Sequence, residues 1–133
     1  DGITPQAIVL LIGTNNVRHG DFTPEQIVDG IRAILDTLGK KCPQSKILLL
    51  GILPRGSNAS DILRRKCDAV NVLLPALADD RRIHYLNANT KLLNADSTLS
   101  QSIAPDLLHL SAKGYAILAE QIELKLQNIL ATE

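Results

Sequence analysis

Aromatic side chains are scarce in this 133-residue chain, which contains Phe22, Tyr85 and Tyr115 and no tryptophan. Few platforms therefore exist on which nucleic-acid bases or sugar rings could stack. An excess of charge is also lacking, because 14 lysines and arginines balance 14 aspartates and glutamates. A neutral chain has no overall attraction to nucleic acid or to an anionic membrane. The basic run at residues 64–66 is interpreted as the solvated face of a helix.

Long hydrophobic runs are absent too, because charged residues interrupt every apolar stretch before it reaches the length of a membrane span. No secretory signal peptide opens the sequence, and both a cytoplasmic and a secreted or periplasmic location stay open. The two cysteines, Cys42 and Cys67, are too few for a disulfide scaffold and form no metal-binding pattern. The histidines His19, His84 and His109 lack the spacing of zinc ligands. We therefore expect no metal and no cofactor.

Apolar residues make up 45% of the chain, and they fall in alternating strand-like and helix-like segments. Three continuous apolar runs indicate strands buried on both faces, as in parallel sheets: residues 7–12, 47–53 and 83–86. Apolar residues at three- and four-residue spacing predict helices over residues 24–38, over 60–78 and from Ser111 to about residue 129. This order is typical of a three-layer α/β/α fold with a flavodoxin-like parallel sheet and right-handed crossovers.

Capping and breaking residues mark the ends of the predicted helices: a Thr23-Pro24-Glu25-Gln26 start and a Gly39 stop for the first, a Ser60-Asp61 start and a bend or end at Pro75 for the second, and a Ser111 cap for the last. Cys67 lies on the apolar face of the second helix, so we expect a buried thiol.

The predicted sheet is incomplete. Right-handed crossovers put the first two helices on one face and leave only the C-terminal helix for the other. The strand at residues 7–12 is too apolar for an exposed edge, and parallel strands need cover on both faces. The 133 residues are therefore interpreted as one domain that lacks its first strands and first helix. We expect a partner chain, a second copy or the rest of a cleaved precursor to cover the gap.

Two polar motifs fall at the carboxyl edge of this sheet, where sites form in α/β proteins. Gly13-Thr14-Asn15-Asn16 ends the first strand, and Asn15 would present an amide donor of the kind that an oxyanion hole requires. An ordinary turn is the alternative, because Gly and Asn are common turn residues. Asp106 precedes His109 by three residues, so its carboxylate could orient the imidazole as a general base. Taken alone, Asp-x-x-His is also a common loop pattern.

Taken together, the segments at residues 13–16 and 106–109 resemble the third and fifth sequence blocks of the SGNH (GDSL-like) hydrolase superfamily. The LGILPRG segment at residues 50–56 and the LHLS-x-x-GY segment at 108–115 are most similar to the branch of platelet-activating-factor acetylhydrolase catalytic subunits and their bacterial relatives. The likeness runs from Ile3 to Leu130.

The resemblance implies that Asn15 is an oxyanion-hole donor, that His109 is the general base and that Asp106 orients His109. Asn16 replaces the Asp of most superfamily members, as in the acetylhydrolase-like branch. Other residues that could line the site are Gly13, Thr14, Asn16, His19 and Arg55. For His19 an exposed loop position is the favoured alternative, and Arg55 could equally contact substrate or tie down a loop. His84 is interpreted as structural.

The nucleophile of the family is missing from these residues. Neither the Gly-Asp-Ser block nor the second-block glycine is present, and we expect none of the serines at 57, 60, 97, 100, 102 and 111 to substitute, since they are interpreted as helix caps or loop residues. The leading hypothesis is a carboxylester hydrolase for acetyl or short-acyl esters of a lipid or sugar, with a serine supplied from outside the chain. The resemblance also implies a homodimer. The alternative is an inert SGNH-like module that binds or scaffolds.

Overall fold

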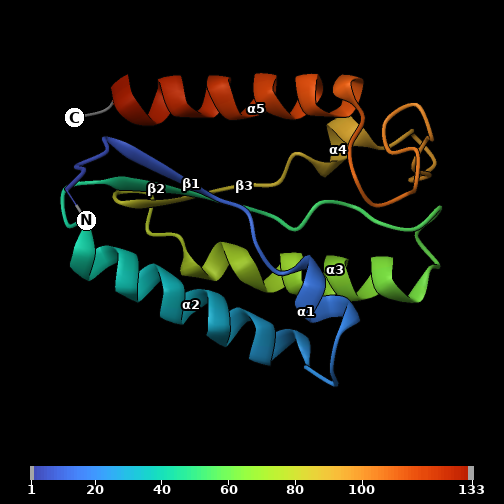
Figure 1. Ribbon diagram of the computed structural model, residues 1–133, viewed down its shortest axis with the longest axis horizontal. Coiled ribbons are helices and arrows are strands. Elements are labelled where there is room, and N and C mark those ends of the chain that lie inside the picture. Colours follow the sequence, from blue (N-terminus) through green and yellow to red (C-terminus); the bar gives the residue numbers. More distant parts are fainter. Residues whose placement is uncertain (1, 132–133) are drawn as a thin grey trace.

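Three parallel strands lie between two layers of helices in the computed structural model, which describes residues 2–131 (Figure 1). In chain order the elements are β1 (Ala7–Leu10), α1 (Thr14–Arg18), α2 (Pro24–Lys41), β2 (Lys46–Leu50), α3 (Ile62–Leu73), the 3-10 helix η1 (Leu74–Leu77), β3 (Ile83–Leu86), α4 (Asn89–Leu92) and α5 (Ala112–Ala131). Helices α2 and α3 cover one face of the sheet and α5 covers the other (Figure 1). The predicted α/β/α arrangement is confirmed.

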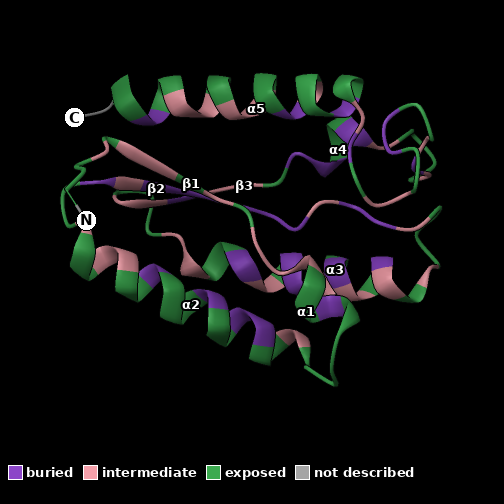
Figure 2. Cartoon of the chain, viewed as in Figure 1, coloured by how far each residue is buried: buried purple, intermediate pink, exposed green. Residues whose placement is uncertain are grey.

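The strand order is β1-β2-β3, so β2 is the central strand. Its side chains alternate between the two faces, as a pleated strand requires. Ile47 and Leu49 join the apolar cluster beneath α2 and α3, whereas Leu48 and Leu50 join the cluster beneath α5. Figure 2 shows β2 as a buried strand with helical cover on both sides.

Strand β1 is poorly covered, as the predicted gap beside residues 7–12 requires. Within residues 2–131 it pairs only with β2, and it forms one edge of the sheet. Val9 is 41% exposed and Leu11, just beyond the strand, is 40% exposed. Helix α5 packs against β3 and α4, so burial on both faces holds for β2 and not for β1.

Two of the three apolar runs continue past the strands that they predict. The runs at 7–12 and 47–53 correspond to strands that end at Leu10 and Leu50, whereas β3 covers the predicted residues. Beyond β2, the side chain of Asn71 makes the hydrogen bonds to the backbone that a neighbouring strand would make. Its Oδ1 accepts from the Ile52 N–H (2.7 Å) and its Nδ2 donates to the Ile52 carbonyl (2.9 Å). Ile52 is therefore buried without being part of a strand.

Helix α2 begins as predicted and ends later than predicted. The Thr23 hydroxyl accepts from the Gln26 N–H, and the Gln26 side chain accepts from the Thr23 N–H, which is a capping box. Gly39 does not stop the helix, which continues to Lys41. A side chain at position 39 would meet the guanidinium of Arg82 at 3.1 Å, so the glycine makes room for this arginine.

Helix α3 begins at Ile62, and its N-cap is Asp61 rather than Ser60. The Asp61 carboxylate accepts from two N–H groups of the first turn, whereas the Ser60 hydroxyl donates to Asn58. The helix ends at Leu73, and the chain then enters η1, which contains Pro75, as predicted. Cys67 is buried as expected, and burial raises the pKa of its thiol to about 11. In α5, the Ser111 hydroxyl accepts from the Gly114 N–H, which confirms the cap.

Arg64 contradicts the interpretation of residues 64–66 as a solvated face. It is 1% exposed and donates to three backbone carbonyls, those of Arg55 (2.9 Å), Gly56 (2.8 Å) and Ser97 (2.8 Å). Arg64 precedes the buried Cys67 by three residues and so lies on the same side of α3. Its long side chain reaches the carbonyls of two loops, and the helical pattern of α3 does not predict where those loops lie.

Candidate active site

A cavity of about 170 Å³ lies where β1 and β2 end and the loop before α5 returns to the sheet. Its polar wall consists of Thr14, Asn15 and His109. The remaining lining residues are apolar or aromatic: Leu11, Ile12, Ile52, Leu53, Leu108, Leu110 and Tyr115. The structure therefore brings the two polar motifs, which lie at opposite ends of the sequence, to one cavity.

Asn15 lies in the first turn of the short helix α1, directly after β1. Gly13 precedes this helix with a φ of 120°, a conformation that L side chains rarely adopt, and a Cβ there would lie 2.9 Å from the Ile52 side chain. Its carbonyl accepts from the Val17 N–H (3.1 Å). The change of chain direction at Gly13 thus starts a short helix rather than an isolated turn. Asn15, in this helix, lines the cavity.

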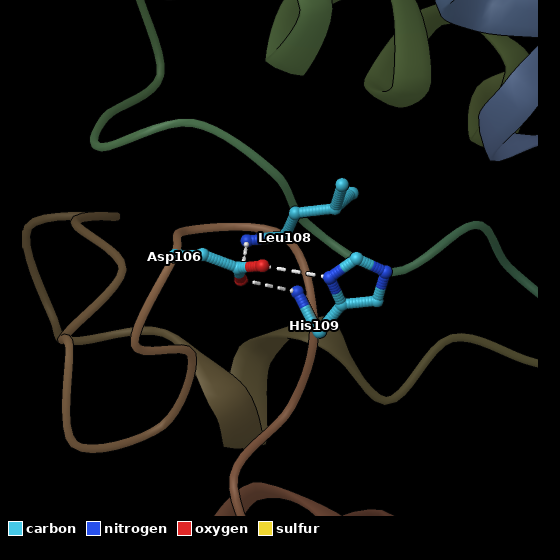
Figure 3. A network of polar contacts seen from close by, with 3 residues as sticks. All are labelled: Asp106, Leu108 and His109. Carbon is cyan, nitrogen blue, oxygen red and sulfur yellow. Dashed lines mark hydrogen bonds and ion pairs between the residues drawn. The ribbon is translucent and has the colours of Figure 1, made fainter.

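Asp106 and His109 form a compact turn in the loop before α5 (Figure 3). The Asp106 Oδ2 atom lies 2.7 Å from Nδ1 of His109, and Oδ1 accepts from the backbone N–H groups of His109 (2.7 Å) and Leu108 (3.0 Å). Leu107, inside the turn, has a φ of 58°. The second ring nitrogen of His109 points away from Asp106 in Figure 3.

These contacts set the electrostatics of the pair. The hydrogen bond from the His109 ring, together with those from the backbone N–H groups, lowers the pKa of Asp106 to about 2. The carboxylate is therefore ionised at neutral pH and accepts the proton on Nδ1, which leaves the lone pair of a neutral ring on Nε2. The His109 side chain is 76% exposed and lines the cavity.

Other predicted site residues lie elsewhere. Gly13 and Asn16 line a second cavity of about 230 Å³ beside α2, together with Phe22 and Ile34. His19 is exposed just after α1 and is not among the residues that line the cavity of Asn15 and His109. This position matches the favoured interpretation of His19 as an exposed loop residue.

Arg55 and His84 are both buried polar residues. Arg55 is 7% exposed and donates through Nη1 to the Thr14 carbonyl (3.2 Å) and hydroxyl (3.1 Å). The sequence left open whether Arg55 contacts substrate or ties down a loop. The observed contact is within the protein, with the first residue of α1. His84 lies on β3, where its Nε2 is 3.2 Å from the Arg81 carbonyl, which fits a structural residue.

No serine within residues 2–131 lines the cavity. The Ser111 hydroxyl donates to the Ser102 carbonyl, and those of Ser100 and Ser102 contact each other at 2.8 Å. Over the same residues no three His, Cys, Asp or Glu side chains gather as metal ligands. No helix in that range is long and apolar enough to cross a membrane.

Sequence reasoning missed part of the apolar wall. It gave Tyr115, in the last predicted helix, no place in the site, but this side chain is 57% exposed and lines the cavity. Leu53 and Leu110 also line it. Their places in the sequence could have indicated this, because Leu53 comes shortly after a buried strand and Leu110 directly follows His109.

The chain is similar in sequence to known proteins. Residues 1–117 match the model of the GDSL-like Lipase/Acylhydrolase family. The human platelet-activating factor acetylhydrolase IB subunit alpha1 is 37% identical over 132 residues, which cover 98% of this chain and 55% of that protein. The chain thus spans about half the length of this curated relative.

Solved structures share the fold. The structure of a platelet activating factor protein from Streptococcus pneumonia superimposes with a TM-score of 0.78 and 26% identity, over 91% of this chain and 59% of that one. A carbohydrate esterase family 3 structure from Talaromyces cellulolyticus gives a TM-score of 0.75 and 22% identity, over 97% and 61%. With the family match and the human relative, the conclusion is that the chain belongs to the GDSL-like lipase/acylhydrolase family.

Proposed function

We propose that this chain supplies the general base and an oxyanion-hole donor to a carboxylester hydrolase that cleaves acetyl or other short-acyl esters. The observation that carries the proposal is the shared cavity, because the His109–Asp106 pair and Asn15 meet there despite their separation in sequence. A domain with a purely structural role has no need for this convergence.

In the proposed mechanism, a serine hydroxyl attacks the ester carbonyl as Nε2 of His109 takes its proton. Asp106 holds Nδ1 and stabilises the imidazolium that forms. The side-chain amide of Asn15 donates to the oxyanion of the tetrahedral intermediate, where negative charge develops. His109 then returns the proton to the leaving alcohol, and a second cycle with water releases the acid from the acyl-enzyme.

The cavity walls favour a small acyl group. Leucine and isoleucine side chains make up most of the lining, and the volume is about 170 Å³. An apolar wall of this kind accepts an acyl methyl group but offers few donors to a polar acid. The names of the human relative and the fungal structure refer to an acetylhydrolase and a carbohydrate esterase. Acetylated lipids and acetylated sugars are therefore the proposed substrate classes.

The nucleophilic serine is proposed to come from outside these 133 residues. Strand β1 offers an open edge and half-exposed apolar side chains at positions 9 and 11. Such an edge pairs readily with a further strand. A preceding segment of the same polypeptide, or a separate chain, would pair there and carry the serine to the His109 side of the cavity.

The proposal is tested with 4-nitrophenyl acetate and the native assembly that includes the serine. His109→Ala should lower kcat by at least about 1,000-fold, because His109 is the only general base among the cavity-lining residues of the described range 2–131. His19→Ala is the matched control and should stay within about threefold of the unaltered protein, since His19 is exposed away from the cavity. Retention of full activity by His109→Ala, with an unchanged melting temperature, would rule out His109 as the base.

A further inference from the structure

The loop after β2 contains a buried arginine whose role the proposed mechanism leaves unassigned. Arg55 is 7% exposed, which is unusual for a charged side chain unless its donors have partners. Its Nη1 donates to both the carbonyl and the hydroxyl of Thr14. Thr14 directly precedes Asn15, and both line the cavity, whereas Arg55 does not. The guanidinium therefore binds the first residue of α1 without lining the cavity itself.

The backbone of the same loop is joined to the other half of the site. The Gly56 N–H donates to the Leu107 carbonyl at 2.9 Å. Leu107 lies inside the turn that pairs Asp106 with His109, and its positive φ of 58° shows how tightly this turn is shaped. Two consecutive residues, Arg55 and Gly56, thus connect the turn of the proposed base with the helix of the proposed oxyanion donor.

Arg64 in turn fixes this connecting loop. It donates to the carbonyls of Arg55 and Gly56 from a position that is 1% exposed. Gly56 has a φ of 77°, and a Cβ there would collide with the carboxyl group of Asp61, the N-cap of α3. The loop that contains Arg55 is therefore held in place against α3. This fixes the position from which Arg55 donates to Thr14.

We propose that Arg55 is a positioning residue, which holds Thr14 so that the Asn15 amide is aimed at the reacting oxygen in register with His109. This role rests on the proposed esterase function. Oxyanion donors act only within about 0.5 Å of the productive geometry, and a displacement of about 1 Å can lower a rate by about 100-fold. A helix of one turn, such as α1, has few internal contacts that could set its orientation by themselves.

A double-mutant cycle on the native assembly, with 4-nitrophenyl acetate, separates positioning from general support of the fold. Arg55→Met should lower kcat by about 10- to 100-fold and leave KM within about threefold, because the donor is misplaced rather than the substrate site lost. In an Asn15→Ala background the same substitution should cost less than about threefold, since the amide that it positions is already gone. Equal losses in both backgrounds would overturn the proposal.

Arg65→Met is the control, because Arg65 is the same residue type on the exposed side of α3; its kcat should stay within about twofold. If Arg55→Met melts early, Arg55→Lys enters the same cycle under the same criteria. A retained kcat for Arg55 variants alongside a loss for Asn15→Ala would refute only the positioning role. Full activity in both Asn15→Ala and His109→Ala would refute the proposed function, and the positioning role with it.

Discussion

At the scale of single residues, the Asp106–His109 pair was accessible from the sequence because both partners lie within one turn of chain. A three-residue spacing lets a carboxylate reach an imidazole without any knowledge of the fold, and the observed 2.7 Å contact bears out that expectation. The burial of Arg64 could not be predicted, because its acceptors lie outside helix α3: those of Arg55 and Gly56 are in the loop after β2, and that of Ser97 is 33 residues further along the chain. Patterning assigns charged residues to solvent by default, and only the folded chain identifies such an exception.

Asp106→Asn should lower kcat for 4-nitrophenyl acetate by about 10,000-fold, because an amide no longer enforces the tautomer that His109 needs. The pKa of Asp106 is about 2, so this carboxylate stays ionised from about pH 4 upward. The deficit of the variant should therefore be nearly constant between about pH 5 and pH 9. A rate profile measured over this range checks the prediction, and a variant that recovers full activity at high pH would contradict it.

At the scale of elements, periodicity identified the long segments and missed the short ones. The capping box of α2 and the Ser111 cap of α5 appear where the sequence predicts them. Helices α1 and α4 have five and four residues, too few for a 3.6-residue repeat to be visible. The end of β2 was missed for another reason. The apolar run continues past Leu50, but the Ile52 N–H and carbonyl bond to the Asn71 side chain instead of to a strand.

The anchoring of α3 to the loops gives a stability prediction. Arg64→Met keeps most of the side-chain volume but leaves three backbone carbonyls without their donor. Buried acceptors that lose a charged partner cost about 1 to 3 kcal/mol each before relaxation, so the free energy of unfolding should fall by about 3 kcal/mol. Urea denaturation of the native protein measures this loss.

The same denaturation experiment on Arg65→Met gives the matched comparison, because that side chain lies on the exposed side of α3. Its free energy of unfolding should change by less than about 0.5 kcal/mol. Equal effects of the two substitutions would mean that the Arg64 contacts contribute nothing specific to the fold.

At the scale of the whole molecule, the sheet has a cavity at one end of its strands and an open edge at β1. Strand β1 brings the segment at residues 13–16 to one edge of the sheet, and the loop before α5 brings the Asp106–His109 turn to the same cavity. The open flank of β1 was also anticipated, because residues 7–12 are too apolar for a free edge. The identity of whatever pairs with that flank lies outside the sequence, since pairing through backbone groups leaves no side-chain signature in the strand that receives it.

The central claim is that this chain provides base and oxyanion donor to a serine that it does not contain. Labelling of the native material with a fluorophosphonate, followed by intact mass measurement of every chain and mapping of the adduct, tests it most directly. The account predicts one adduct on a serine outside these 133 residues, and loss of labelling in His109→Ala. An adduct on a serine within the chain, or labelling that persists without His109, would contradict it. If nothing is labelled, the chain is an inert member of the family.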